Sequence, residues 1–166
     1  MKTLLCVDGN SILNRSFYGI RPLTNSKGLH TNAIYGFCNV LLGKLESLKP
    51  DYAAVAFDRK EPTFRHEAYG AYKAGRRPMP PELAEQFPFA KQCAEALGFT
   101  VLELAGYEAD DILGSCAALA EKAGMQAFLF TGDRDALQLI DDATTVLLAT
   151  NKETIPFDRA RFTEHY

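Results

Sequence analysis

Short apolar runs alternate along the chain with longer segments whose apolar residues recur every three or four positions. Five runs have the length of strands and most are almost continuously apolar, as strands buried on both faces are; they are 3–7, 52–57, 100–104, 126–131 and 145–149. Helical periodicity marks the segments 31–49, 81–98 and 108–124. This alternation predicts one α/β domain over 1–166, with a mainly parallel central sheet flanked by helices on both faces.

The predicted helices differ in how clearly they end. The segment 31–49 places on one face Ile34, Phe37, Cys38, Leu41, Leu42 and Leu45. The segment 108–124 does the same with Ala109, Ile112, Leu113, Cys116, Ala117 and Ala120. Gly124 suits a C-terminal stop. Pro88 should kink or split the segment 81–98, because proline cannot donate a helical hydrogen bond.

Acidic residues follow four of the five predicted strands. They are Asp8, Asp58, the group Glu108, Asp110 and Asp111, and the pair Asp133 and Asp135. The carboxyl ends of parallel strands share one edge of a sheet, where ligands of open α/β sheets bind. We therefore expect these carboxylates to converge. On the third helix, Glu108 and Asp111 share a face by their i, i+3 spacing, whereas Asp110 is expected to point elsewhere.

Two explanations compete for these acids. An aspartate after a strand is often a helix N-cap, and this would account for Asp8 or Asp133 taken singly. Caps need one acceptor per helix, however, and no matching basic residue is apparent beside seven acids. Divalent metal would neutralise them, and hard oxygen ligands favour Mg²⁺ or Mn²⁺. Two ions about 3.5–4 Å apart would suit an in-line displacement at phosphate.

Charge is distributed unevenly along the 166 residues. The net charge is −3 at pH 7, yet residues 59–77 hold six basic and two acidic residues. The surrounding segment 59–80, named here the arch segment, also contains Phe64, Tyr69 and Tyr72. Basic residues neutralise phosphates and aromatic rings stack on bases, so this segment is a candidate nucleic-acid contact. A solvated loop with incidental charge is the alternative.

Other features narrow the class of protein. The apolar runs are far shorter than the roughly 20 residues of a membrane helix, and the apolar start of the chain stops at Asp8, too soon for a signal peptide. A cytoplasmic location without membrane contact is the expectation. The four cysteines show no C-x-x-C spacing, so we expect buried, reduced thiols and no zinc site.

Five stretches together resemble a known family in their order and spacing. They are CVDGNSILNRSFYG, PDYAAVAFDRKEPTFRHE, YKAGRRPMP, GYEADDILG and TGDRDALQL. They are similar to the 5′-nuclease domain of bacterial DNA polymerase I, within the flap endonuclease family, and the resemblance covers essentially the whole chain. It implies a PIN-like 5′-nuclease core and a structure-specific 5′-nuclease that removes flaps or RNA primers in replication and repair.

The resemblance also implies roles for particular residues. Asp8, Asp58, Glu108 and Asp110 would serve a first Mg²⁺ or Mn²⁺ ion. Asp133 and Asp135 would serve a second, with Asp110 shared, and Asp111 would hold water on the metal. In the arch segment, Tyr72, Lys73 and Arg76 would hold the scissile phosphate, with Arg65 and Arg15 near other phosphates. The implied partners are DNA with a 5′ flap or nick, an RNA primer paired with DNA, and a polymerase region downstream.

The chain departs from the family after FTEHY. Family members continue into a helix-rich part with two further aspartates and a duplex-gripping motif, so we expect a fragment with weak or no activity of its own. The alternatives are a PIN-type ribonuclease, a fragment that binds DNA without cutting it, and a phospho-acceptor receiver domain. The receiver pattern needs one acceptor aspartate, and the chain has too many acids for it.

Overall fold

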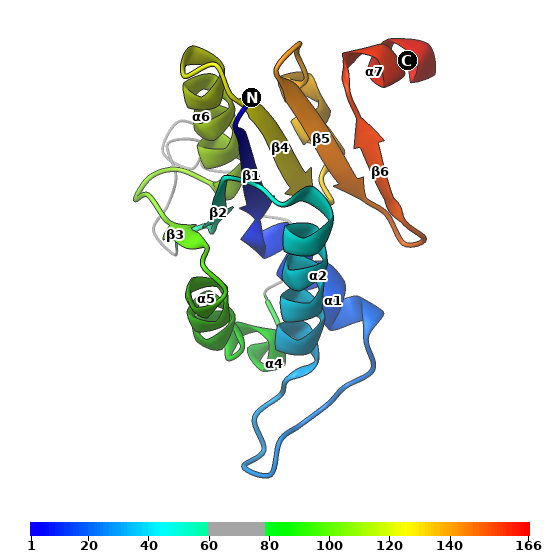
Figure 1. Ribbon diagram of the computed structural model, residues 1–166. Helices are drawn as coiled ribbons and strands as arrows, with labels where there is room; N and C mark the ends of the chain where they lie inside the picture. Colours follow the sequence, from blue (N-terminus) through cyan, green and yellow to red (C-terminus); the bar gives the residue numbers. More distant parts are fainter. Residues whose placement is uncertain (60–78) are drawn as a thin grey trace.

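The structure, a computed structural model, describes residues 1–59 and 79–166. Their centre is a sheet in the order β3-β2-β1-β4-β5-β6 (Figure 1). The strands are β1 (Thr3–Asp8), β2 (Tyr52–Ala56), β3 (Thr100–Leu102), β4 (Gln126–Thr131), β5 (Thr144–Ala149) and β6 (Thr154–Phe157). The first five are parallel, as predicted, and β6 is antiparallel to β5.

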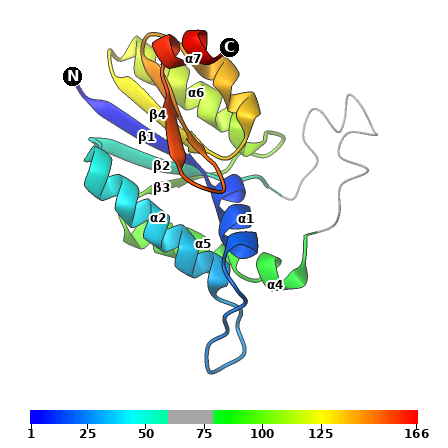
Figure 2. The ribbon, with the colours of Figure 1, turned by 90° about the vertical axis from the view of Figure 1, so that its right-hand side faces the viewer.

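Helices cover both faces of the sheet (Figure 2). On one face lie α1 (Gly9–Gly19), α2 (Asn32–Leu48), α4 (Pro81–Ala84) and α5 (Phe87–Ala96). The other face is covered by α6 (Ala109–Lys122) and by the 3-10 helix η1 (Arg134–Leu139), and α7 (Arg159–His165) follows β6. The predicted α/β architecture is confirmed.

The apolar strands supply two core layers because successive side chains of a strand point to opposite faces. Leu5, Val7 and Val55 pack with α1, α2 and α5. Cys6, Leu129 and Val146 pack with α6 and η1. The four cysteines are free, as predicted. Cys6 is buried, but the other three, which were also expected to be buried, are only partly so.

Local sequence features explain most helix boundaries. Pro88 lies in the first turn of α5, so the predicted helix 81–98 is split into α4 and α5. Gly124 follows α6 with a φ of 72°, a left-handed conformation that glycine adopts without strain. The predicted apolar face of α6 is confirmed: its residues are buried, and Cys116 is partly so.

Two expectations about the elements were wrong. Leu42 was placed on the buried face of α2, but its side chain is 42% exposed. The residues that pack inward are Ala33, Gly36, Phe37 and Leu41, and Leu42 lies about 100° round the helix from Leu41. The sequence reading also missed β6, a four-residue edge strand that contains Pro156. Proline is tolerated there because an edge strand leaves some amide positions unpaired.

No helix among residues 1–59 and 79–166 combines the length and the apolar character needed to cross a membrane.

Candidate metal centre

The connections that follow β1 and β4, two neighbouring strands at the middle of the sheet, run to opposite faces of the sheet. After β1 the chain enters α1 on one face, and after β4 it enters η1 on the other. Such a switch point leaves a crevice at the carboxyl ends of the two strands, where ligands of doubly wound sheets bind. Asp8 is the last residue of β1 and Thr131 is the last residue of β4.

Asp8 is one of the two buried acids of this edge: it is only 6% exposed, and Glu108 is 5% exposed. Asp8 Oδ1 accepts a hydrogen bond from the Ser11 amide (3.1 Å), and its Oδ2 accepts one from the Thr131 hydroxyl (2.9 Å). The pKa of Asp8 is raised from 3.8 to about 6, chiefly by burial and to a smaller extent by the negative charges of Asp58 and Asp110. The hydrogen bonds oppose this rise without cancelling it. Asp58, which follows β2, and Asp110, in α6, therefore lie near enough to Asp8 for their charges to act on it.

Asp58 follows β2 and joins two helices. Its Oδ1 accepts a hydrogen bond from the amide of Ala109, the first residue of α6, at 2.6 Å. Its own amide donates to Asn10 Oδ1 in the first turn of α1, at 2.8 Å. The starts of α1 and α6 are thus held against the end of β2.

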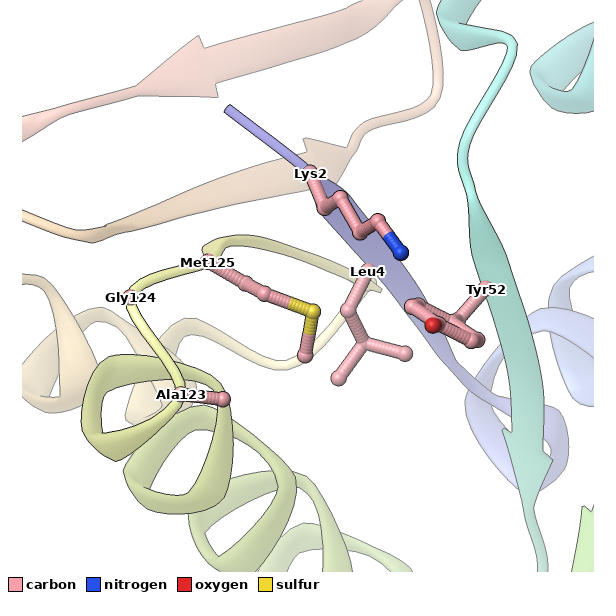
Figure 3. A pocket seen from close by; sticks show the side chains of 6 residues that line it. All are labelled: Lys2, Leu4, Tyr52, Ala123, Gly124 and Met125. Atoms are coloured by element: carbon pink, nitrogen blue, oxygen red, sulfur yellow. The ribbon is translucent and has the colours of Figure 1, made fainter.

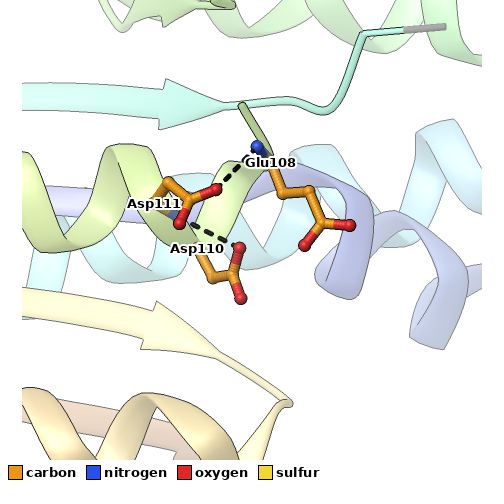
Figure 4. Close-up of side chains that lie close together, drawn as sticks. All are labelled: Glu108, Asp110 and Asp111. Carbon is orange, nitrogen blue, oxygen red and sulfur yellow. Dashed lines mark hydrogen bonds between the residues drawn. The ribbon is translucent and has the colours of Figure 1, made fainter. Parts of the chain in front are cut away.

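Three acids gather where α6 begins (Figure 4). Glu108, Asp110 and Asp111 each offer a carboxylate oxygen, and these oxygens lie within 4.8 Å of one another. Asp111 Oδ2 accepts from the Glu108 amide and Asp110 Oδ1 accepts from the Asp111 amide, both at 3.0 Å. The expectation that Asp110 points elsewhere was wrong, because the first turn of α6 lets all three reach one point.

Asp133 and Asp135 follow β4 and are exposed. Asp133 Oδ1 accepts from the Asp135 amide at 2.9 Å, which caps η1. Asp135 shares the wall of an open cavity of about 500 Å³ with Asp110, Asp111, Gly114 and Ser115. This cavity connects the start of α6 with η1.

Capping and metal binding are therefore not exclusive explanations for these acids. At least five of the seven accept a hydrogen bond from a backbone amide: Asp8, Asp58, Asp110, Asp111 and Asp133. The positive potential of helix N-termini helps these carboxylates to lie close together. Capping thus accounts for more of these acids than expected, and each carboxylate keeps lone pairs for a metal beyond those that the amides use.

A basic residue also lies at this edge, contrary to expectation. Arg15 of α1 directs Nη2 at the carbonyl of Gly132 (3.4 Å) and Nη1 at Asn151 Oδ1 (3.3 Å). Gly132 leaves room for this side chain, because a Cβ at that position would collide with the Arg15 guanidinium. One predicted phosphate contact is thereby placed beside the turn that carries Asp133.

Polar residues that the sequence reading missed hold this edge together. Asn10 binds the amide of Asp58, and Ser11 Oγ accepts from the Gly132 amide at 2.8 Å. The Thr131 hydroxyl binds Asp8 and accepts from the Asp133 amide at 3.1 Å. The only sequence signal was a small polar residue at the end of an apolar run.

The other predicted contact residues, Arg65, Tyr72, Lys73 and Arg76, lie outside the described residues, as does nearly all of the arch segment. At the opposite edge of the sheet, a second cavity of about 390 Å³ is lined by Lys2, Leu4, Tyr52 and 123–125 (Figure 3). Lys2 Nζ lies 5.7 Å from the centre of the Tyr52 ring there. No acid lines that cavity among the described residues, in contrast to the cavity at the carboxyl edge.

The chain is similar to known proteins over nearly its whole length. It is 48% identical over 147 residues to DNA polymerase I of Bacillus subtilis. The aligned region covers 89% of this chain and 17% of the relative. It is 45% identical over 144 residues to the thermostable DNA polymerase I of Thermus thermophilus, again covering 17% of the relative. The chain thus spans about a sixth of the length of the curated relatives it matches.

Solved structures share its fold. The D15 protein of bacteriophage T5, co-crystallised with metal ions, superposes with a TM-score of 0.73 at 21% identity, over 99% of this chain and 60% of that one. The catalytic core of Rad2 in complex with a DNA substrate superposes with a TM-score of 0.52 at 14% identity, over 99% and 49%.

Residues 3–166 match the family described as 5′-3′ exonuclease, N-terminal resolvase-like domain. The match includes every acid of the carboxyl edge and both sides of the switch point. The chain therefore belongs to the 5′-3′ exonuclease family, of which it forms the N-terminal resolvase-like domain.

Proposed function

We propose that the chain is the 5′-nuclease part of a bacterial DNA polymerase I, and that it hydrolyses phosphodiester bonds at 5′ ends and flaps with divalent metal ions. The observation that carries this proposal is the buried Asp8 at a switch point, on which the negative charges of Asp58, after β2, and Asp110, in α6, act. A buried carboxylate beside two further negative charges is costly without a cation.

The donor set fits a hard divalent cation. All the candidate ligands are carboxylates, which Mg²⁺ and Mn²⁺ prefer, and two of them, Glu108 and Asp110, form with Asp111 a group whose carboxylate oxygens lie within 4.8 Å of one another. We assign Asp8, Asp58, Glu108 and Asp110 to a first ion, and Asp133, Asp135 and the shared Asp110 to a second. When bound, such ions supply a nucleophile at neutral pH and stabilise charge on the phosphate.

The protein's own groups have separate roles. The low exposure of Asp8 and Glu108 excludes water from the inner part of the edge, which strengthens electrostatic interactions there. The amides at the starts of α1 and α6 fix the carboxylates before a substrate arrives. Asp111, which binds the Glu108 amide, is placed to orient water next to the cluster.

The proposed substrate and partners are based on the similarity to known proteins. Chains named DNA polymerase I supply the similarity in sequence, and one structural neighbour is a T5 flap endonuclease in a pseudo-enzyme-product complex with DNA and metal ions. We infer nicked or flapped DNA and RNA primers on DNA as substrates, a polymerase region downstream, and work in the cytoplasm. Contacts from Arg65, Tyr72, Lys73 and Arg76 to the substrate remain predictions.

Cleavage of a labelled 5′-flap DNA tests the proposal directly. With enzyme in excess over substrate, so that even slow cleavage is seen, the chain should cut the flap when Mg²⁺ or Mn²⁺ is present and stop when the metal is chelated. A structured RNA of equal length serves as the comparison. Preferential cutting of the RNA would favour the ribonuclease alternative. DNA binding with no metal-dependent cutting would favour the alternative of a fragment that binds DNA without cutting it.

Arg15 is expected to contact a phosphate of the DNA. Arg15→Ala should weaken binding of every DNA sequence to a similar extent, and the slope of log K against log salt should become shallower by about one unit. Arg159→Ala is the matched control, because Arg159 pairs with the exposed Asp142 before β5, at the far edge of the sheet. Equal salt slopes for the two variants would exclude Arg15 from the contact.

A further inference from the structure

Thr131 occupies a special place in the sheet. Thr131 is fully buried, and its Oγ1 donates a hydrogen bond to Asp8 Oδ2 (2.9 Å) and accepts one from the Asp133 amide (3.1 Å). A hydroxyl has one proton to donate, so the bond from the Asp133 amide leaves that proton for Asp8. One small group thus joins an acid of β1 to the backbone that carries the acids after β4.

The backbone itself does not make this connection. The parallel pairing of β1 with β4 runs from Thr3 opposite Gln126 to Val7 opposite Phe130, and it ends there. Asp8 and Thr131 are the next residues on the two strands. The bond between their side chains links the two chain segments just past the end of the backbone pairing. The bond from the Gly132 amide to Ser11 Oγ links them again further along.

We propose that Thr131 is a positioning residue of the metal centre, which sets the spacing between Asp8 and the turn that bears Asp133 and Asp135. The inference rests on the proposed function, since it assigns Thr131 to the same metal centre. Residues that orient metal ligands by hydrogen bonds affect metal affinity almost as strongly as the ligands do. Thr131 touches neither metal nor substrate in this role and acts through the two groups it binds.

Valine has nearly the shape of threonine but no hydroxyl, so Thr131→Val removes both hydrogen bonds, whereas Thr131→Ser keeps the oxygen. Thr144→Val is a matched control. Thr144 is a threonine of the neighbouring β5 that is only 1% exposed, and its hydroxyl has no hydrogen-bond partner within residues 1–59 and 79–166.

The experiment measures Mn²⁺ binding to the chain by calorimetry, together with the melting temperature of each metal-free variant. Thr131→Val should bind Mn²⁺ about 10- to 100-fold more weakly than the wild type, the usual effect of losing a group that orients a ligand. Thr131→Ser should restore most of the affinity, and Thr144→Val should leave it unchanged. A purely structural role would lower the melting temperature without this selective loss of affinity.

Equal Mn²⁺ affinity of the wild type and Thr131→Val would overturn the inference while leaving the proposed function intact. Failure of the wild type itself to bind Mn²⁺ would overturn both. Should Thr131→Val not fold, Thr131→Ser and Thr131→Ala form the decisive pair, because they differ by a single oxygen atom. Weaker binding by the alanine variant alone supports the inference, and equal binding by both overturns it.

Discussion

Asp8→Asn is expected to stabilise the metal-free chain at pH 7 and to abolish cleavage. Burial holds the pKa of Asp8 at about 6, above the 3.8 of an ordinary aspartate. The stability that this carboxyl contributes is therefore fully present below about pH 4 and is lost as the pH rises through 6. At pH 7 the neutral asparagine avoids this cost, so the free energy of unfolding should rise by about 1–3 kcal/mol.

Urea unfolding at pH 4 and pH 7 in the presence of a chelator measures this effect. The difference between wild type and Asp8→Asn should be largest at pH 7 and should shrink towards pH 4. Asp51→Asn is the control. Asp51 also accepts a hydrogen bond from a backbone amide, that of Thr3, but it is exposed and lies before β2, at the opposite edge of the sheet from Asp8. Lower stability of Asp8→Asn at pH 7 would mean that the hydrogen bonds of Asp8 outweigh the cost of burying its charge.

Metal should reverse the order of stability, so that the wild type becomes more stable than Asp8→Asn. Mg²⁺ or Mn²⁺ should raise the melting temperature of the wild type, since a ligand that binds only the folded state stabilises it. The same addition should have little effect on Asp8→Asn, and its cleavage of a 5′ flap should be slower by at least about 100-fold, the effect of one misplaced catalytic element. An unchanged cleavage rate would remove Asp8 from the metal centre.

Gly9→Ala is expected to be the most disruptive substitution of a small residue. A Cβ at Gly9 would lie 2.5–2.8 Å from three atoms of the Phe57 ring. That ring is fully buried, and its centre lies 6.1 Å from the ring centre of Phe37 and 6.1 Å from that of Phe87, so its neighbours restrict any shift away from the added Cβ. The free energy of unfolding should fall by about 1–3 kcal/mol, the usual cost of overpacking a core.

The site should be affected as well, because Gly9 lies between Asp8 and Asn10, and Phe57 precedes Asp58. Gly43→Ala is the control. It lies inside α2 with nothing near the added Cβ, so it should stabilise the chain by about 0.5–1 kcal/mol through the higher helix propensity of alanine. Thermal unfolding of both variants checks that the stability changes have opposite signs. A Gly9→Ala variant as stable as the wild type would show that the Phe57 ring can shift after all.

The sequence by itself determined the position of every parallel strand and of the acids that follow them. Strands buried on both faces must be apolar throughout, so the runs ending at Val7, Phe57 and Thr131 were visible, and so was each acid just beyond them. In a parallel sheet these ends share one edge, which made the convergence of the acids predictable. Pro88 and Gly124 marked helix boundaries for equally local reasons.

Only the tertiary structure decided how the acids are held. The bonds from Thr131 to Asp8, from Gly132 to Ser11 and from Ala109 to Asp58 join residues 123, 121 and 51 positions apart. Periodicity and spacing report on neighbours within a few positions, so they carry no signal for such pairs. The order β3-β2-β1-β4-β5-β6 was hidden for the same reason. It places β1 beside β4, and that contact makes Thr131, an ordinary threonine at the end of a strand, a neighbour of the buried Asp8.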